Sequence, residues 1–240
     1  MIAPTILAIA AGAVAAVSGF GIGSLLTPVL LLTFDPHEAV ALVAVPHAVA
    51  SSIRLARLRA DIDWTTFRQF GLASAFGGLL GALLQARLGG TLLTAVLGVL
   101  LITAGAGELI RRQLPLPQTP IWRLAGGAVS GFFGGLVGNQ GGLRTAALLG
   151  FQLTPRQLVA TSTASAVIVD LSRLPIYVAI SGETLAANPV LLFGTSLGVI
   201  IGTFIGVPVL GRIPESGYRR IIGGLLVVLG ISLIVSFRTL

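Results

Sequence analysis

Eight apolar stretches, most of them close to 20 residues long, follow one another along the chain and decide what it can fold into. They occupy roughly residues 3–33, 37–58, 64–86, 91–110, 121–150, 156–180, 189–210 and 218–237. A helix of about 20 residues spans a hydrocarbon core about 30 Å thick. Only 10% of the residues are charged, against about 25% in an ordinary soluble domain. The sequence therefore predicts an all-α, multi-pass membrane protein whose apolar surface is covered by the lipid bilayer.

The charged residues exclude several other classes of protein. The net charge is +7 and all 15 basic residues are arginine, placed in short clusters between the apolar stretches. This distribution is typical of cytoplasmic loops and not of a nucleic-acid-binding face, so we expect no nucleic-acid partner. There are no cysteines and only two histidines, and no nucleotide-binding motif is present, so we expect neither a metal site nor a cofactor. No basic residue precedes the first apolar stretch, so a cleaved signal peptide is not expected.

Two of the apolar stretches are too long to cross a membrane once. Residues 3–33 and 121–150 would each form a helix of roughly 45 Å. Each contains a glycine cluster, at residues 19–24 and 134–142. Glycine is unfavourable inside a helix, so we predict that both stretches break there into two half-helices. Each pair of half-helices then either turns back to its own side of the membrane or completes the crossing.

The second half of the chain repeats the first. An offset of 119 residues matches glycine, proline and arginine at the same places relative to the apolar stretches, pairing Gly19 with Gly138, Gly23 with Gly142, Pro36 with Pro155 and Arg54 with Arg173. We predict a first repeat over 1–110, a polar, proline-rich linker over 111–120 and a second repeat over 121–240. If the broken stretches turn back, each half crosses three times and the halves are inverted. This arrangement places more of the arginines on one side, so the positive-inside rule favours it.

The glycine clusters also indicate where an anion would bind. A half-helix that begins within the membrane has unpaired N–H groups and the positive end of its dipole at that point, and an anion complements both. The predicted substrate-binding residues lie in and just after the two clusters: Gly21, Gly23, Ser24, Asn139, Gln140, Gly141, Gly142, Arg144 and Thr145. The alternative is that the glycines only allow neighbouring helices to cross closely.

Arg144 is the most specific of these candidates. It follows the second glycine cluster in an otherwise uncharged stretch, where a cation is costly unless it is paired. Its guanidinium group is suited to bidentate capture of an oxyanion. The alternatives are a structural ion pair with Asp170, or a side chain that reaches to the membrane surface.

Four other residues are candidates for coupling or gating: His47, Asp170, Arg173 and Tyr177. Asp170 and Arg173 lie three residues apart and share a helix face, either as a structural salt bridge or with Asp170 as a proton carrier. Tyr177 lies one turn further on and can donate to either. His47 is either packed against a carbonyl or part of a proton relay. The hydroxyl-bearing residues 161–165 either line the pathway or bond to their own helix backbone.

Three segments resemble the TauE/SafE family of sulfite and sulfonate exporters. The resemblance rests on the glycine cluster with Leu25, Leu26, Thr27 and Pro28, on the segment 35–41 that begins Asp35, Pro36, His37 and Glu38, and on Ile62, Asp63 and Trp64. It extends over nearly the whole chain and implies a multi-pass protein of the inner membrane that exports sulfite, sulfoacetate or a related organic anion. The second half departs from the family pattern at Arg144 and at Asp170 with Arg173.

We therefore expect a secondary transporter that exports a small sulfur-containing or carboxylate anion by alternating access, with protons as a candidate coupling ion. The alternatives are an anion channel and a membrane protein without transport activity. No catalytic motif is present, so an intramembrane enzyme is disfavoured. The sequence leaves open whether the protein forms a homodimer.

Overall fold

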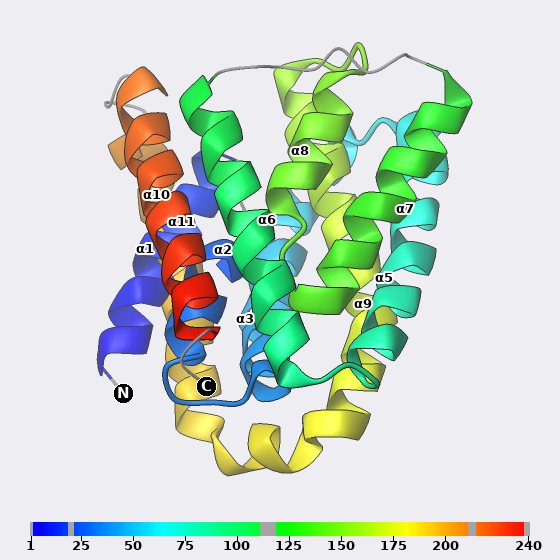
Figure 1. The fold of residues 1–240 in the computed structure, drawn as a ribbon. Coiled ribbons are helices and arrows are strands. Elements are labelled where there is room, and N and C mark those ends of the chain that lie inside the picture. The colour runs from blue at the N-terminus through cyan, green and yellow to red at the C-terminus, as the bar shows by residue number, and fades with distance from the viewer. Residues whose placement is uncertain (1, 19–21, 111–118, 211–214, 238–240) are drawn as a thin grey trace.

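The computed structural model describes residues 2–18, 22–110, 119–210 and 215–237, and within these ranges all regular structure is helical. The elements are α1 (Ile2–Ser18), α2 (Ile22–Leu30), α3 (Pro36–Leu58), η1 (Arg59–Asp61), α4 (Trp64–Thr66), η2 (Phe67–Gly71), α5 (Leu72–Gln85), α6 (Gly90–Ile110), α7 (Pro120–Val137), α8 (Gly141–Leu149), α9 (Pro155–Ala187), α10 (Pro189–Leu210) and α11 (Glu215–Phe237). The helices form a bundle with roughly parallel axes (Figure 1).

Helix length and surface identify a membrane protein. Among the described residues, four helical segments are long and apolar enough to cross a membrane: Pro36–Asp61, Trp64–Gln85, Gly90–Ile110 and Pro155–Ala187. Shorter apolar helices lie at Pro4–Ala16, Pro189–Ile205 and Arg220–Val235. Large apolar side chains such as Phe193 and Ile221 are about 70% exposed on the bundle surface, as expected where lipid replaces water. The expectation of an all-α, multi-pass membrane protein is confirmed.

Both of the long apolar stretches are broken. Helix α1 ends at Ser18 and α2 begins at Ile22, while α7 ends at Val137 and α8 begins at Gly141. In Figure 1, α2 begins at mid-height of the bundle and runs to its lower end, whereas α8 begins at mid-height and runs to its upper end. Each short helix returns to the end of the bundle from which its partner helix started.

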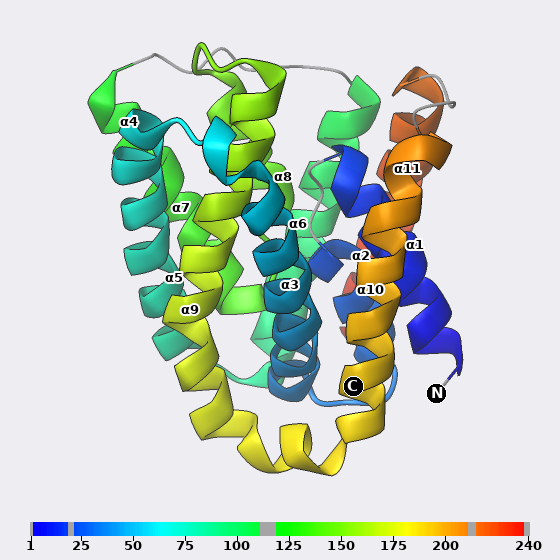
Figure 2. The same ribbon diagram turned by 180° about the vertical axis from the view of Figure 1, so that it is seen from behind.

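Two helices of the second half, α8 and α9, begin 119 residues after α2 and α3 and run in the opposite direction to them. Helix α8 lies 119 residues after α2 at both of its ends, and α9 begins 119 residues after α3. Both α3 and α9 begin with a capping box and a proline, built on Asp35 with Glu38 and on Thr154 with Gln157. Figures 1 and 2 show α3 and α6 running towards the upper end, and α9 and α11 towards the lower end.

Helix pairing follows the same scheme. Helix α3 packs on α9, and α6 packs on α11. Helix α1 packs on α10, and α7 packs on α5. If the halves correspond, the α3–α9 and α6–α11 pairs each join two corresponding helices. The α1–α10 pair of helices then corresponds to the α7–α5 pair.

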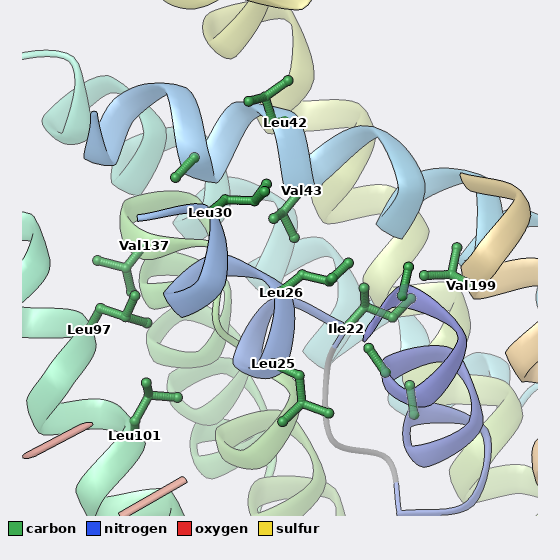
Figure 3. Close-up of a cluster of buried hydrophobic side chains, with 14 of the residues drawn as sticks. Ile22, Leu25, Leu26, Leu30, Leu42, Val43, Leu97, Leu101, Val137 and Val199 are labelled. Carbon is green, nitrogen blue, oxygen red and sulfur yellow. The ribbon is translucent and has the colours of Figure 1, made fainter. Parts of the chain in front are cut away.

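The short helix α2 lies within the largest hydrophobic cluster. Figure 3 shows its side chains Ile22, Leu25, Leu26 and Leu30 surrounded by residues of α3, α6, α7 and α10. The surrounding side chains are Leu42 and Val43 from α3, Leu97 and Leu101 from α6, Val137 from α7 and Val199 from α10. Both halves of the chain therefore hold α2 in place, which fixes the position of the first break.

Close glycine contacts join the helix pairs, and they predict a large difference between two glycine-to-alanine variants. A Cβ added at Gly131 of α7 would lie 2.7 Å from the Cα of Ser74 on α5, where only backbone movement can relieve the overlap. We expect Gly131→Ala to lower the free energy of unfolding by about 1–3 kcal/mol. The matched control is Gly107→Ala in α6, because a Cβ at Gly107 meets nothing within 4 Å. Thermal unfolding in detergent checks both variants, and equal melting temperatures would contradict the α5–α7 contact.

Candidate functional site

The two helix breaks lie against each other inside the protein. Gly23, in the first turn of α2, packs directly against the carbonyl of Gly138. The Ser24 hydroxyl donates to Asn139 Oδ1 at 2.8 Å, across 115 residues of sequence. Gly138 has a φ of 72°, a left-handed conformation that favours glycine, and its N–H donates to the Gly134 carbonyl at the end of α7. The starts of the two short helices therefore meet near the middle of the bundle (Figure 1).

Helix α8 begins in the interior without a side-chain cap. Gln140 occupies the N-cap position, but its side chain makes no capping hydrogen bond. Gln140 and Gly141 are buried, and Gly142 and Thr145 are half-buried on α8. The first N–H groups of a helix have no intrahelical acceptor, and the helix dipole adds positive potential there. This arrangement favours an anion at the start of α8.

Arg144 is buried one turn into α8, with 5% of its surface exposed. Its Nε donates to Ser162 Oγ on α9 at 2.8 Å, and its Nη1 is buried without a hydrogen-bond partner in the described part of the chain. No ion pair joins it to Asp170 among the described residues. The structure therefore differs from both structural alternatives, because Arg144 neither pairs with Asp170 nor extends to the surface.

Two further polar side chains at the breaks have no partner. Both amide atoms of Gln140 and the hydroxyl of Thr27 on α2 are buried and form no hydrogen bond with any residue that the structure describes. Other helical threonines donate to the carbonyl four residues earlier, as Thr163 and Thr195 do. The Thr27 hydroxyl instead lies 3.8 Å from the position that a Cβ on Gly138 would occupy. Thr27 therefore faces the second break and adds a candidate ligand that the sequence reasoning did not single out.

A buried ionic network lies beside the breaks and connects α3 with α9. Asp170 Oδ1 accepts from Arg173 Nη2 at 2.7 Å and from Arg173 Nε at 3.0 Å. Asp170 Oδ2 lies 2.7 Å from His47 Nδ1. Asp170 and Arg173 are each 1% exposed and His47 is 4% exposed. The salt bridge between Asp170 and Arg173 is present, and His47 contacts this carboxylate and not a backbone carbonyl.

Arg173 and Tyr177 attach this network to the last turn of α7. Arg173 Nη1 donates to the Gly134 carbonyl, and the Tyr177 hydroxyl donates to the Gly135 carbonyl at 2.6 Å. A cation near the C-terminus of a helix is favourable because the dipole is negative there. Tyr177 therefore bonds the α7 backbone, and its ring lies beside Arg173, whose guanidinium carbon is 5.6 Å from the ring centroid.

Some of the hydroxyl-bearing residues 161–165 bond to their own helix backbone, and others contact residues of other segments. Thr163 and Ser165 donate to carbonyls of their own helix, Val159 and Thr161 respectively. Ser162 accepts from Arg144, and the Thr161 hydroxyl accepts the backbone N–H of Asp63 at 3.0 Å. Only Ser162 is thereby linked to the helix breaks.

The remaining predicted residues are placed as follows. The structure brings together Gly23, Ser24, Asn139, Gln140, Gly141 and Arg144 at the two breaks, while Gly21 lies outside the described residues. The predicted linker 111–120 lies mostly outside them as well, so the division into two repeats stays a prediction.

Comparison with known families matches residues 5–233 to the family described as "Sulfite exporter TauE/SafE". This match covers nearly the whole chain. The chain belongs to the TauE/SafE family. No match was found among curated proteins or among solved structures. Members of the TauE/SafE family are membrane transporters and not enzymes, and the broken helices described above occur inside the matched region.

Proposed function

We propose that this TauE/SafE protein is a secondary transporter that exports a small sulfur-containing or carboxylate anion, which binds where the two helix breaks meet. One observation carries the proposal: the guanidinium of Arg144 is buried with an unpartnered Nη1 beside the uncapped start of α8. The unpaired Gln140 amide and the Thr27 hydroxyl lie at the same breaks. Buried polar and charged groups normally have partners, so a set without them fits a ligand site.

The chemistry of these groups fits an oxyanion. Guanidinium N–H groups and free helix N–H groups are all donors, and charge-assisted hydrogen bonds to anionic oxygens are about twice as strong as neutral ones. Gln140 and Thr27 supply additional donors and acceptors from the two halves of the chain. Sulfite, sulfonates such as sulfoacetate, and simple carboxylates all carry the required oxygens.

Inverted repeats would allow alternating access around this site. The proposal is supported by the 119-residue match between helix bounds and by the opposite directions of α3 and α9 (Figures 1 and 2). The anion site would lie between the repeats, and rocking one repeat against the other would open it to each side in turn.

We place the protein in the cytoplasmic (inner) membrane with the upper end of the bundle in Figure 1 on the cytoplasmic side. The end of α3, η1 and the starts of α4, α7 and α9 lie at the upper end (Figures 1 and 2). These segments contain Arg57, Arg59, Arg123 and Arg156, with Arg68 in η2 next to α4. The positive-inside rule assigns such an end to the cytoplasm.

Proton coupling would operate through His47 and Asp170. Their 2.7 Å contact joins α3 to α9, which belong to different predicted repeats. A change in the charge of either group would alter this contact and the neutralisation of Arg173. We expect Asp170→Asn to abolish the effect of a pH gradient on transport, and an unchanged effect would remove Asp170 from the coupling mechanism.

Transport in proteoliposomes tests the function. We expect saturable, anion-dependent charge movement with one or two members of a panel of sulfite, sulfoacetate, taurine, sulfate and simple carboxylates. A carrier should also exchange labelled internal anion for external anion, whereas a channel should give flux without exchange. Silence across the panel from folded protein would contradict export of this class of anion by an electrogenic cycle.

A further inference from the structure

The buried charges around the helix breaks are not balanced. Among the described residues the ion pairs are His47–Asp170, Arg173–Asp170 and the more exposed Arg156–Asp61. The Asp170 carboxylate is therefore the ion-pair partner of both His47 and Arg173. Neither Arg144 nor Arg54 is paired with a carboxylate. Two positive charges in the bundle consequently form no ion pair with these residues, although Asp170 attracts Arg144 from a longer distance.

Arg54 is half-buried and its guanidinium contacts a neighbouring helix, whereas the next two arginines along the chain are exposed. It lies near the end of α3, and its Nη1 donates to the Ala15 carbonyl of α1 at 3.3 Å. Its Nε is buried and has no hydrogen-bond partner among the residues of the described ranges. Arg57, by contrast, is exposed and lies over the Phe204 ring, and Arg59 is exposed as well. Arg54 therefore differs from Arg57 and Arg59, because its guanidinium contacts the backbone of α1.

The Arg54 contact has a counterpart in the second half. Arg173 donates to the Gly134 carbonyl of α7, and both of these residues lie 119 positions after Arg54 and Ala15. Each arginine thus bonds the last turns of the helix that precedes a break. In the second half Asp170 neutralises this arginine, but the residue 119 positions before Asp170 is Ser51. The first half therefore retains the arginine without its acid.

Arg54 lies seven residues after His47 on α3, and Ser162, the partner of Arg144, lies eight residues before Asp170 on the antiparallel α9. The His47–Asp170 contact therefore brings Arg54 and Arg144 to the same level of the bundle. At this level their positive charges repel each other, while Asp170 attracts Arg144. Such repulsion is strong where little water is present, and an anion between the two groups would remove it. One negative charge would neutralise only one guanidinium. A ligand with two negative charges would neutralise both.

We propose that Arg54 is a second anion-binding residue and that, together with Arg144, it makes the site select doubly charged anions over singly charged ones. Arg54 comes from the first predicted repeat and Arg144 from the second, so a dianion would contact both repeats. This inference rests on the proposed function, because it requires an anion at the helix breaks.

The test compares two sulfonates that keep their charge throughout the neutral pH range. Ethane-1,2-disulfonate carries two negative charges and ethanesulfonate carries one. Binding of each is measured by calorimetry on the full chain in lipid nanodiscs at pH 7 and constant ionic strength. We expect the unmodified protein to bind the disulfonate at least tenfold more tightly, about the effect of one added charge-assisted hydrogen bond.

Three variants assign the preference to Arg54. Arg54→Gln should bring the two affinities to within about threefold of each other, whereas Arg54→Lys should retain the preference because it keeps the charge. The exposed control Arg59→Gln should also retain it, because a surface charge is screened. A purely structural role for Arg54 would change both affinities equally and leave their ratio unaltered.

Two results would overturn the inference. Equal affinity of the unmodified protein for the two sulfonates would show that the site does not select charge, even if Arg54→Gln failed to fold. An unchanged ratio in folded Arg54→Gln would remove Arg54 from the site. In either case measurable binding would leave the proposed function standing, whereas no binding of either sulfonate would contradict both proposals.

Discussion

Arg144→Gln is expected to weaken anion binding by about 100-fold or more while the protein remains folded. The substitution removes a charge-assisted donor, which contributes about 1.5–3 kcal/mol, together with the electrostatic attraction of a buried positive charge. Folding should be retained, because Arg144 has no carboxylate partner to leave unpaired and its hydrogen bond goes to the neutral Ser162. Calorimetry with the best anion of the transport panel measures the affinity, and thermal unfolding measures the stability.

The control for this prediction removes a positive charge elsewhere. Arg156 is exposed and pairs with Asp61 at 3.4 Å, so Arg156→Gln should leave anion affinity within about twofold of the unmodified protein. If Arg144→Gln bound the anion as tightly as the control does, Arg144 would have no role in binding. The anion would then have to be held elsewhere.

Asp170→Ala is expected to lower the free energy of unfolding by about 3–5 kcal/mol, because it leaves Arg173 charged and buried without its partner. The double variant Asp170→Ala with Arg173→Met should recover much of this loss, since it removes the unpaired charge and fills a similar volume. Thermal unfolding of the purified proteins in the same detergent compares the two.

The more exposed ion pair of Arg156 and Asp61 provides the reference for this loss of stability. Asp61→Ala breaks a pair in which Arg156 is 78% exposed, and we expect it to change stability by about 1 kcal/mol or less. If Asp170→Ala were no more destabilising than Asp61→Ala, Arg173 would have access to another partner or to water. The buried network would then not hold α3, α7 and α9 together as described.

The bounds and breaks of the helices follow from features that the sequence displays directly. Length and apolarity mark the membrane helices, and the two stretches that exceed one crossing contain the glycines at which the helices stop, Gly138 among them. Capping residues such as Asp35 and Thr154 recur at the same offset as the helices they begin. What sequence does not supply is which helices pack together, because apolar faces of similar composition suit many partners.

The candidate site was predictable where a residue type is costly in its surroundings, as for Arg144 and for Asp170 with Arg173. Contacts between distant segments were not, and the Ser24–Asn139 hydrogen bond and the His47–Asp170 contact depend on how the halves pack. Thr27 has no local signal, because a helical threonine ordinarily bonds its own backbone. The contact of Arg54 with α1 was not predicted, because exposed arginines lie beside Arg54 in the sequence. Its match with Arg173 at the 119-residue offset was the available signal.

The central claim is that an anion binds where α2 and α8 begin, and locating one in crystals tests it most directly. Selenite, in which selenium replaces the sulfur of sulfite, can be found by its anomalous scattering in crystals of the full chain. We expect an anomalous peak within about 4–5 Å of the Arg144 guanidinium carbon, as a hydrogen-bonded oxyanion requires. Selenite peaks confined to other positions, with none at the two helix breaks, would contradict it.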